Sequence, residues 1–384
     1  MKIFNLFALS LLLVYSCDSD DQNKQYHAPI EIDFAITDSI TLPQPENEYW
    51  YGGKIESGEE VVHYLLYDKP NEKAFELGSY SNTKGYRLIR QIKLFENGLM
   101  GNRVSSFGLL GEKSILLVTD GGVHLYNLEG QLVRSAREEA PLIDMMNLSV
   151  HTVMEKDSLN GFLVSHQNSG EETLMTTDPE FYQKHKLFSF YKYEDLMYQN
   201  HVLEIDPESK MRSTQSPRGY YNFSSINASN KNELLVVCNP VPRYALYTLI
   251  APFQIKEAYD INLPWFQEEA INTPMIYSLY TTSSFTGVAI DDRYLYFSVR
   301  SGVPQDEIKQ GVSPEDGFKL FVKNNKNYLV VRERSSEKYY QTILPAKVNS
   351  LVTSFQDGRL LLTQNINEVE SKEGVTLYIA KIYH

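Results

Sequence analysis

Residues 222–248 read NFSSINASNKNELLVVCNPVPRYALYT, and this stretch decides the fold. A short apolar segment with serines, 223–226, is separated by an asparagine-rich turn from the more hydrophobic run 233–237. Asparagine is a residue type that reverses the chain between strands. A continuous apolar run indicates a strand buried on both faces, whereas the alternation in 244–250 is typical of a strand with two unlike faces. The stretch therefore predicts consecutive antiparallel hairpins.

The same pattern recurs along the chain, which is the mark of a repeat architecture. Four further copies and a weaker one lie at 104–118, 150–164, 285–297, 351–362 and 50–66. A second hairpin with alternating apolar residues follows most copies, at 123–134, 244–250, 318–331 and 375–380. Two hairpins per repeat predict a four-stranded antiparallel blade. The segments 171–220 and 300–317 are expected to be long loops.

Six such units predict an all-β protein, a single β-propeller of six four-stranded blades over residues 31–384. The segments 31–36 and 39–42 are expected to form a strand pair that completes the last blade and closes the ring. Seven blades are an alternative, because 186–191 could begin another blade. A pair of β-sandwiches joined near 205–220 is a second alternative. Recurrence of the hairpin pattern on both sides of that segment favours the propeller.

The N-terminal segment predicts an export signal. Its apolar run, 6–14, has the length of a signal peptide and is short for a membrane span. The residues Val14-Tyr15-Ser16-Cys17 that follow resemble the bacterial lipobox, in which the cysteine is linked to lipid. We therefore expect a signal peptide at 1–16 and a lipidated tether at 17–30. Cleavage after another small residue, which would remove Cys17, is the alternative.

The acidic segment Asp18-Ser19-Asp20-Asp21 resembles the stretch that follows the lipidated cysteine in surface lipoproteins of Bacteroidetes. It predicts a lipid-anchored protein of the cell envelope, at the outer membrane. A plain solvated tether and retention at the inner membrane are the alternatives. The lipobox and the six blades together resemble a family of Bacteroidetes propeller lipoproteins of the TolB-like six-bladed type. That resemblance implies location and fold, and it brings no active site with it.

Charge and cysteine content exclude several classes of protein. The net charge of −13 repels phosphate backbones, so we expect no nucleic-acid partner. The membrane is instead expected as a partner through the lipid anchor. Only Cys17 and Cys238 are present, so lipidation of the first excludes an intramolecular disulfide. Cys238 follows the apolar run 233–237 and is expected to be a buried thiol.

Motifs that would identify a catalytic or metal centre are absent from the sequence. It contains no G-x-S-x-G elbow, no H-E-x-x-H helix, no EF-hand loop and no Walker loop. Its eight histidines, His151 among them, are not spaced as paired ligands on one element, so we expect no metal and no cofactor. The turn carboxylates Asp291 and Asp292 have no evident partner for acid–base chemistry. The catalytic residues, if any, stay unknown.

One segment stands out as a candidate binding site, because aromatic and basic side chains alternate between 179 and 219. Such a mixture, in an acidic chain, predicts recognition of an acidic glycan or peptide. The alternative is an outer hairpin packed on its own blade. The candidate binding residues are Tyr182, Lys184, Lys186, Tyr191, Tyr193 and Arg218.

These observations favour a binding or scaffold module that recognises a peptide, protein or glycan at the cell envelope. Fold alone does not dictate this function, because propellers host many activities. The alternative is an envelope enzyme, a glycan hydrolase or lyase, whose residues converge from different blades at the propeller channel. Three or more charged side chains within hydrogen-bond reach of one another would favour the enzyme.

Overall fold

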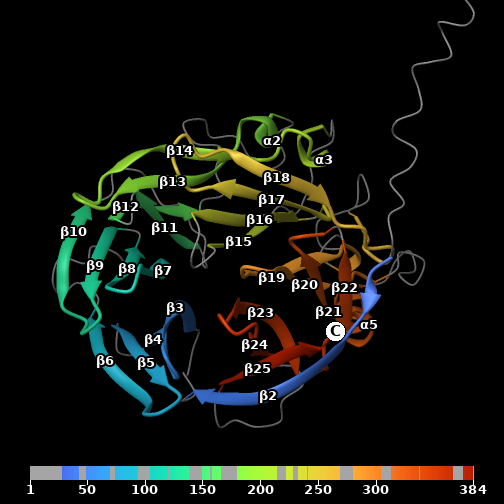
Figure 1. Cartoon of the computed structure of the whole chain (residues 1–384), viewed down its shortest axis with the longest axis horizontal. Coiled ribbons are helices and arrows are strands. Elements are labelled where there is room, and N and C mark those ends of the chain that lie inside the picture. The colour runs from blue at the N-terminus through green and yellow to red at the C-terminus, as the bar shows by residue number, and fades with distance from the viewer. Residues whose placement is uncertain are drawn as a thin grey trace, which may run out of the picture.

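A computed structural model gives the arrangement of the chain from Ala28 to Tyr383 (Figure 1). It describes residues 28–42, 49–69, 74–93, 104–119, 121–137, 149–155, 158–165, 180–213, 222–227, 232–239, 241–268, 280–303, 313–336, 338–365 and 375–383. The strands form six sheets arranged as a ring, which confirms the six-bladed propeller. The β-sandwich and seven-bladed alternatives are therefore excluded.

The first three blades follow one another in chain order, each strand pairing with the next. Blade one consists of β3 (Tyr49–Ser57), β4 (Glu60–Lys69), β5 (Ala74–Ser81) and β6 (Gly85–Lys93). Blade two consists of β7 (Val104–Leu110), β8 (Ser114–Thr119), β9 (Gly122–Asn127) and β10 (Leu132–Arg137). Blade three consists of β11 (Val150–Glu155), β12 (Ser158–Ser165), β13 (Lys186–Lys192) and β14 (Tyr198–Glu204).

The last three blades continue the ring and contain both ends of the described chain. Blade four consists of β15 (Asn222–Asn227), β16 (Glu233–Asn239), β17 (Arg243–Thr248) and β18 (Ile255–Asp260). Blade five consists of β19 (Ser284–Ile290), β20 (Tyr294–Arg300), β21 (Asn327–Glu333) and β22 (Tyr339–Ile343), with β1 (Ile30–Glu31) added at its edge. Blade six consists of β23 (Val348–Ser354), β24 (Leu360–Gln364), β25 (Val375–Tyr383) and β2 (Asp33–Leu42).

The N-terminal strand closes the ring, as the sequence predicts. β2 lies antiparallel to β25, from Asp33 opposite Tyr383 to Leu42 opposite Val375. The expected strand pair is instead one long strand, with an irregularity between Ile36 and Asp38. The short β1 runs parallel to β22 and so attaches the chain to blade five before β2 enters blade six. The outer edge of β25, which would otherwise be unpaired, is thereby covered by β2.

Side chains between neighbouring blades form the core, in six hydrophobic clusters. In β16, Leu234 and Val236 face blade three, whereas Leu235 and Val237 face blade five. All four are at most 2% exposed. Burial on both faces is the physical reason for the continuous apolar run that opens the sequence analysis.

One predicted strand is a helix. The alternation of apolar and polar residues at 318–322 predicts a strand, but the segment lies in α5 (Pro314–Asn324). Ser313 caps the helix by accepting a hydrogen bond from the Asp316 backbone N–H, and Pro314 occupies the first turn, where its missing N–H costs nothing. The second hairpin of blade five is β21–β22 instead. No helix among the described residues is long and apolar enough to span a membrane.

The expected long loop at 171–220 also needs correction, because part of it builds blade three. Its residues include β13 and β14, together with the short helices α2 (Phe181–Lys184) and α3 (Lys210–Ser213). Residues 186–191, which suggested a seventh blade, are the third strand of blade three. The aromatic residues of this segment alternate because they sit in a strand with a buried face.

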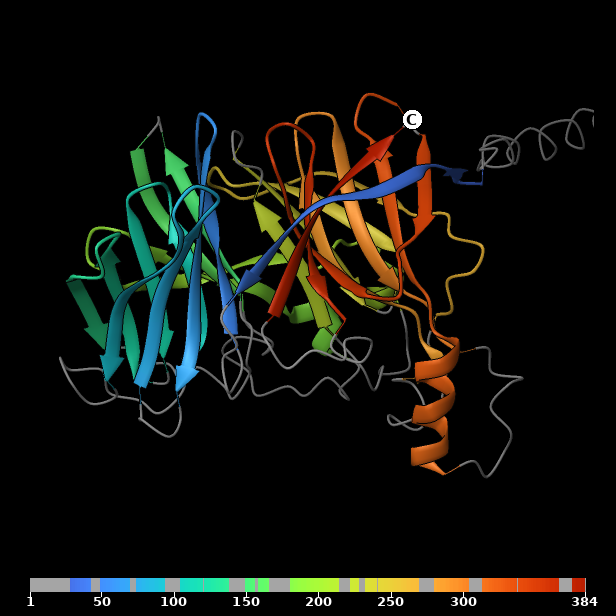
Figure 2. The same ribbon diagram turned by 90° about the horizontal axis from the view of Figure 1, so that it is seen from below.

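The two ends of the ring differ in their connections (Figure 2). The inner strands all begin at one end, the loop end, where the connections include 94–103, 138–149, 205–221, 261–283 and 301–326. The opposite end, the turn end, carries short turns between strands, at 58–59, 82–84, 111–113, 128–131, 291–293 and 334–338. Helix α5 projects at the loop end. Ile30 pairs with Tyr340, near the start of β22, so the chain enters the ring at the turn end.

Candidate functional site

A histidine and two serines meet between blades three and four. His151 Nε2 lies 2.8 Å from the Ser225 hydroxyl oxygen and 3.0 Å from the Ser149 hydroxyl oxygen. The two hydroxyl oxygens are themselves 2.8 Å apart. His151 is the second residue of β11, Ser149 directly precedes that strand, and Ser225 belongs to β15, so the cluster joins two inner strands near the loop end.

Strand register explains why these groups meet. His151 pairs with Leu163 and therefore faces blade four, while Ser225 pairs with Val236 and faces blade three. The imidazole is 5% exposed, and the Phe188 ring lies edge-on to it with 5.5 Å between the ring centroids.

The backbone at Ser149 is fixed by hydrogen bonds to Ser165 of β12. The Ser149 N–H donates to the Ser165 hydroxyl at 2.7 Å, and the Ser165 N–H donates to the Ser149 carbonyl at 3.0 Å. A hydroxyl that donates to a neutral imidazole is the arrangement in which histidine activates serine as a nucleophile. The two serines share one ring nitrogen, so only one hydroxyl at a time donates to it.

A second polar cluster lies where blade six meets blade one. The Tyr51 hydroxyl is 3.1 Å from His63 Nδ1, and Lys54 forms an ion pair with Glu56. The Lys54 ammonium lies 4.7 Å from the centroid of the Phe355 ring, a cation–π contact across the closing seam. The side chains of Lys54 and Glu56 are both partly buried.

Burial controls the ionisation of this seam cluster. It lowers the pKa of Lys54 to about 8, although the Asp357 charge acts in the opposite direction. It also lowers the pKa of His63 to about 4, with a smaller contribution from the Lys54 charge, and it raises the pKa of Tyr51. The imidazole is therefore neutral at pH 7, and the Lys54 ammonium loses its proton more readily than that of an exposed lysine.

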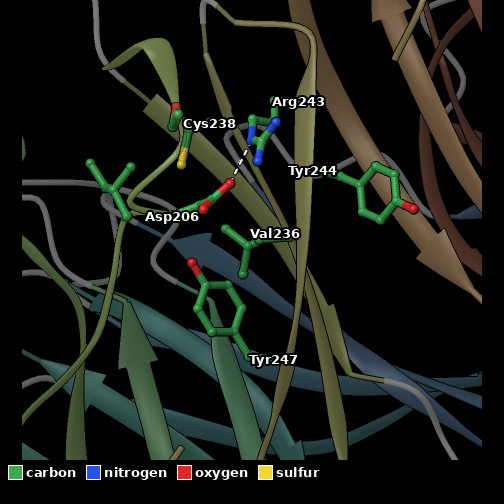
Figure 3. A pocket seen from close by; sticks show the side chains of 9 residues that line it. Asp206, Val236, Cys238, Arg243, Tyr244 and Tyr247 are labelled. Atoms are coloured by element: carbon green, nitrogen blue, oxygen red, sulfur yellow. Dashed lines mark hydrogen bonds and ion pairs between the residues drawn. The ribbon is translucent and has the colours of Figure 1, made fainter. Parts of the chain in front are cut away.

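A small cavity lies on the outer side of blade four, near the loop end (Figure 3). Arg243 crosses it and pairs with Asp206 at 2.5 Å, Asp260 at 3.1 Å and Glu208 at 3.1 Å. Cys238 also lines the cavity and is partly buried rather than fully buried as the sequence predicts. Its volume is about 20 Å³, the space of one water molecule. The cavity is therefore too small to be a candidate ligand site.

The structure disperses the binding residues predicted from the sequence. Tyr182 and Tyr191 are each 1% exposed and lie in the cores on opposite sides of blade three. Lys184 forms an ion pair with Glu180 on the surface, and Lys186 forms one with Glu204. Arg218 lies outside the described residues, as does Cys17. Tyr191 belongs to the β13–β14 hairpin and Tyr182 to α2, and both pack between neighbouring blades.

Tyr193 joins blade three to blade two. Its hydroxyl lies 3.3 Å from the Ser114 hydroxyl, and its carbonyl accepts a hydrogen bond from the Arg134 guanidinium at 2.8 Å. Tyr191 stacks on Phe162, with 5.1 Å between centroids and an interplanar angle of 1°. The aromatic character of the segment thus serves packing between strands.

Sequence reasoning did not find the Ser149, His151 and Ser225 cluster, because each residue lies in a different local context. Ser149 and His151 are two positions apart at the start of one predicted strand, a spacing that favours a shared face. Ser225 lies on the opposite face of its own repeat, and only the ring places that face against His151. Among the described residues, no group of three His, Cys, Asp or Glu side chains is arranged to hold a metal ion.

No known protein family matches the chain, and no curated protein matches it. Solved structures similar to it include the WD40 domain of Neurospora crassa Pan2, with 9% identity, coverage of 92% of this chain and 97% of that chain, and a TM-score of 0.44. Another is the β-propeller domain of the trilobed protease from Pyrococcus furiosus, with 10% identity, coverage of 87% and 83%, and a TM-score of 0.37. The strand pairing described above establishes the fold: a single six-bladed β-propeller closed by its N-terminal strand.

Proposed function

We propose that this protein is a lipid-anchored propeller lipoprotein of the bacterial cell envelope, similar to those of Bacteroidetes, and that it binds a peptide, protein or glycan. The observation that carries the proposal is the asymmetry between the two ends of the ring. Long connections gather at the loop end, and the chain enters at the turn end. An anchor attached before Ala28 therefore leaves the loop end free for a ligand.

The arrangement suits recognition because loops tolerate sequence variation while a rigid scaffold holds their ends. The blades supply that scaffold through six buried inter-blade clusters. Described strands of all six blades begin or end at the loop end, so one surface can combine contacts from distant parts of the chain. A membrane-facing position at the outer membrane follows from the lipobox and the acidic tether, which support the proposal from sequence.

The anchor is tested by changing Cys17→Ala. Removal of the thiol removes the attachment point for lipid, and we expect the variant to be unprocessed or to stay in the aqueous phase on detergent partitioning. The wild-type chain is expected in the detergent phase, because two or more acyl chains hold a soluble domain stably. Equal partitioning of the two proteins would contradict the lipid anchor.

Ligand recognition is tested with a photo-crosslinking side chain placed at either end of the ring. At Lys323, on α5 at the loop end, we expect crosslinks to an envelope component in intact cells. At Glu112, in an exposed turn at the opposite end, we expect none of that species. The same crosslinked species from both positions would show that the loop end is not the recognition surface.

A second candidate function is acyl hydrolysis, and the Ser149, His151 and Ser225 cluster favours it specifically. A serine hydroxyl hydrogen-bonded to an imidazole suits attack on an ester, whereas glycosidic hydrolysis uses two carboxylates. A fluorophosphonate probe should then label Ser225 or Ser149 in the native protein and should fail to label the His151→Gln variant. Absence of labelling in the wild-type protein, with labelling of a control serine hydrolase, would exclude this second function.

A further inference from the structure

The turn between β17 and β18 differs in composition from the other described turns at its end of the ring. Turns of this kind normally carry polar residues or glycine, as at 58–59, 82–84, 111–113 and 291–293. The residues 250–253 read Ile-Ala-Pro-Phe, without a polar side chain. Ile250 is 56% exposed, Ala251 and Pro252 are exposed, and Phe253 is half-buried. A run of exposed apolar residues is unfavourable in water unless something covers it.

The tip is held firmly in its outward position. Phe253 N–H donates to the Ile250 carbonyl at 3.0 Å, and Thr248 N–H donates to the Gln254 carbonyl at 2.8 Å. Leu249 is fully buried before the tip, and the Phe253 ring packs edge-on against Phe190 of blade three at 5.4 Å. The exposed side chains therefore cannot turn inward without breaking these contacts.

Other apolar side chains lie exposed at the same end of the ring. Met197 is 49% exposed in the β13–β14 turn of the adjacent blade, and Ile255 is exposed at the start of β18. Ile30 is exposed where the chain enters the ring at blade five. Twenty-seven residues precede Ala28, and in the proposed function Cys17 among them carries the lipid. The membrane that holds the lipid is thus the apolar surface nearest to this end.

We propose that the hairpin tip 250–253 docks against the lipid surface and orients the propeller with its loop end away from the membrane. This inference rests on the proposed lipid anchor. Apolar residues at such a surface enter the boundary between headgroups and acyl chains, at a depth of about 5–10 Å. The contact is apolar, so the net charge of −13 does not oppose it on uncharged lipid.

The test uses the full lipidated chain on vesicles of phosphatidylcholine and phosphatidylethanolamine that contain acyl-chain nitroxide lipids. Cys238→Ala removes the native thiol, and a fluorophore is attached at Gln254→Cys beside the tip or at Lys323→Cys on the loop end. We expect strong quenching at 254 and little at 323. Ile250→Glu in the Gln254→Cys protein should lower quenching to the level seen at 323, while its far-ultraviolet circular dichroism stays unchanged.

Each outcome separates docking from anchoring. A chain that floats with the vesicles but is quenched equally at 254 and 323 overturns the docking and leaves the anchor standing. A chain that floats with the vesicles and is still quenched at 254 after Ile250→Glu also overturns the docking, because the tip is then not the part that contacts the lipid. Failure to float overturns the anchor, and the docking with it. A tip that stays unquenched on vesicles but crosslinks to a protein in cells would assign the surface to a protein partner instead of lipid.

Discussion

Three buried histidines of this protein, His63, His124 and His151, form hydrogen bonds with hydroxyl groups. His63 meets the Tyr51 hydroxyl, His124 meets Ser135 at 3.0 Å, and His151 meets two serines. Burial lowers the pKa of both His63 and His124 to about 4, so these rings stay neutral in the folded chain. A hydrogen-bonded neutral imidazole can be buried, whereas burial of an unpaired charge is costly.

The lowered pKa of His63 predicts a loss of stability in acid. The unfolded chain binds a proton near pH 6.5, and the folded chain resists it until about pH 4. Because folding lowers the pKa of the His63 imidazole, its contribution to the free energy of unfolding is fully present above pH 6.5 and is lost as the pH decreases toward 4. Between pH 7 and pH 5 this one group should cost about 2 kcal/mol.

Urea unfolding at pH 7 and pH 5 measures this effect. His63→Gln keeps a side-chain hydrogen-bonding group for the Tyr51 hydroxyl and removes the titration, so its free energy of unfolding should fall less between the two pH values than that of the wild type. His124→Gln should reduce the pH dependence in the same direction. If both variants keep the wild-type difference between pH 7 and pH 5, these histidines are not buried as neutral groups.

At the scale of elements, ion pairs join helices and loops to the blades. Arg243, at the start of β17, holds the segment between β14 and α3 through Asp206, and both side chains are about 10% exposed or less. Burial would lower the pKa of Arg243, but its hydrogen bonds to Asp206 and Asp260 raise it. The pair is thus a cross-connection between blades three and four, in addition to their shared hydrophobic cluster.

Removing one member of this pair should be more harmful than removing both. Arg243→Met leaves the Asp206 carboxylate buried without its cationic partner and with only the Glu208 N–H as a donor, and it should cost about 3–5 kcal/mol in the free energy of unfolding. The double variant Arg243→Met with Asp206→Leu should recover much of that loss, and Glu208→Ala, at an 83% exposed side chain, should leave the unfolding midpoint unchanged. Equal losses in the single and double variants would show that packing, not charge, dominates at this position.

At the scale of the whole molecule, the ring is closed by a strand from the opposite end of the chain. β2 supplies Ile40 and Leu42, which are at most 4% exposed, to the cluster between blades six and one. The seam cluster, in which the Lys54–Glu56 ion pair contacts the Phe355 ring, lies in the same junction. Closure therefore depends on contacts between residues more than 300 positions apart, such as Ile40 and Leu377.

Deletion of residues 31–42 tests this closure. Loss of two buried aliphatic side chains and a complete strand should cost at least about 5 kcal/mol, which is comparable to the whole stability of a small domain. The exposed edge of β25 should also promote aggregation. Thermal unfolding and size-exclusion chromatography measure both effects.

Deletion of residues 18–27 is the matched control, because they precede the described strands. It should leave the melting temperature unchanged. A chain without residues 31–42 that stays monomeric with an unaltered melting temperature would contradict the importance of N-to-C closure.

The sequence by itself determined most of the strands, the six blades and the N-terminal closure, because period-two alternation and apolar runs report burial locally. It placed β13 and β14 within an expected long loop. It misjudged 318–322, where the cap formed by Ser313 and Pro314 outweighs alternation. Only the tertiary structure decided which polar residues meet. His151 and Ser225 come together because neighbouring blades pack face to face. No local sequence pattern specifies which side chains of two neighbouring repeats will be in contact. The same packing buries Tyr182 and Tyr191, whose aromatic character in sequence is shared by binding surfaces and cores alike.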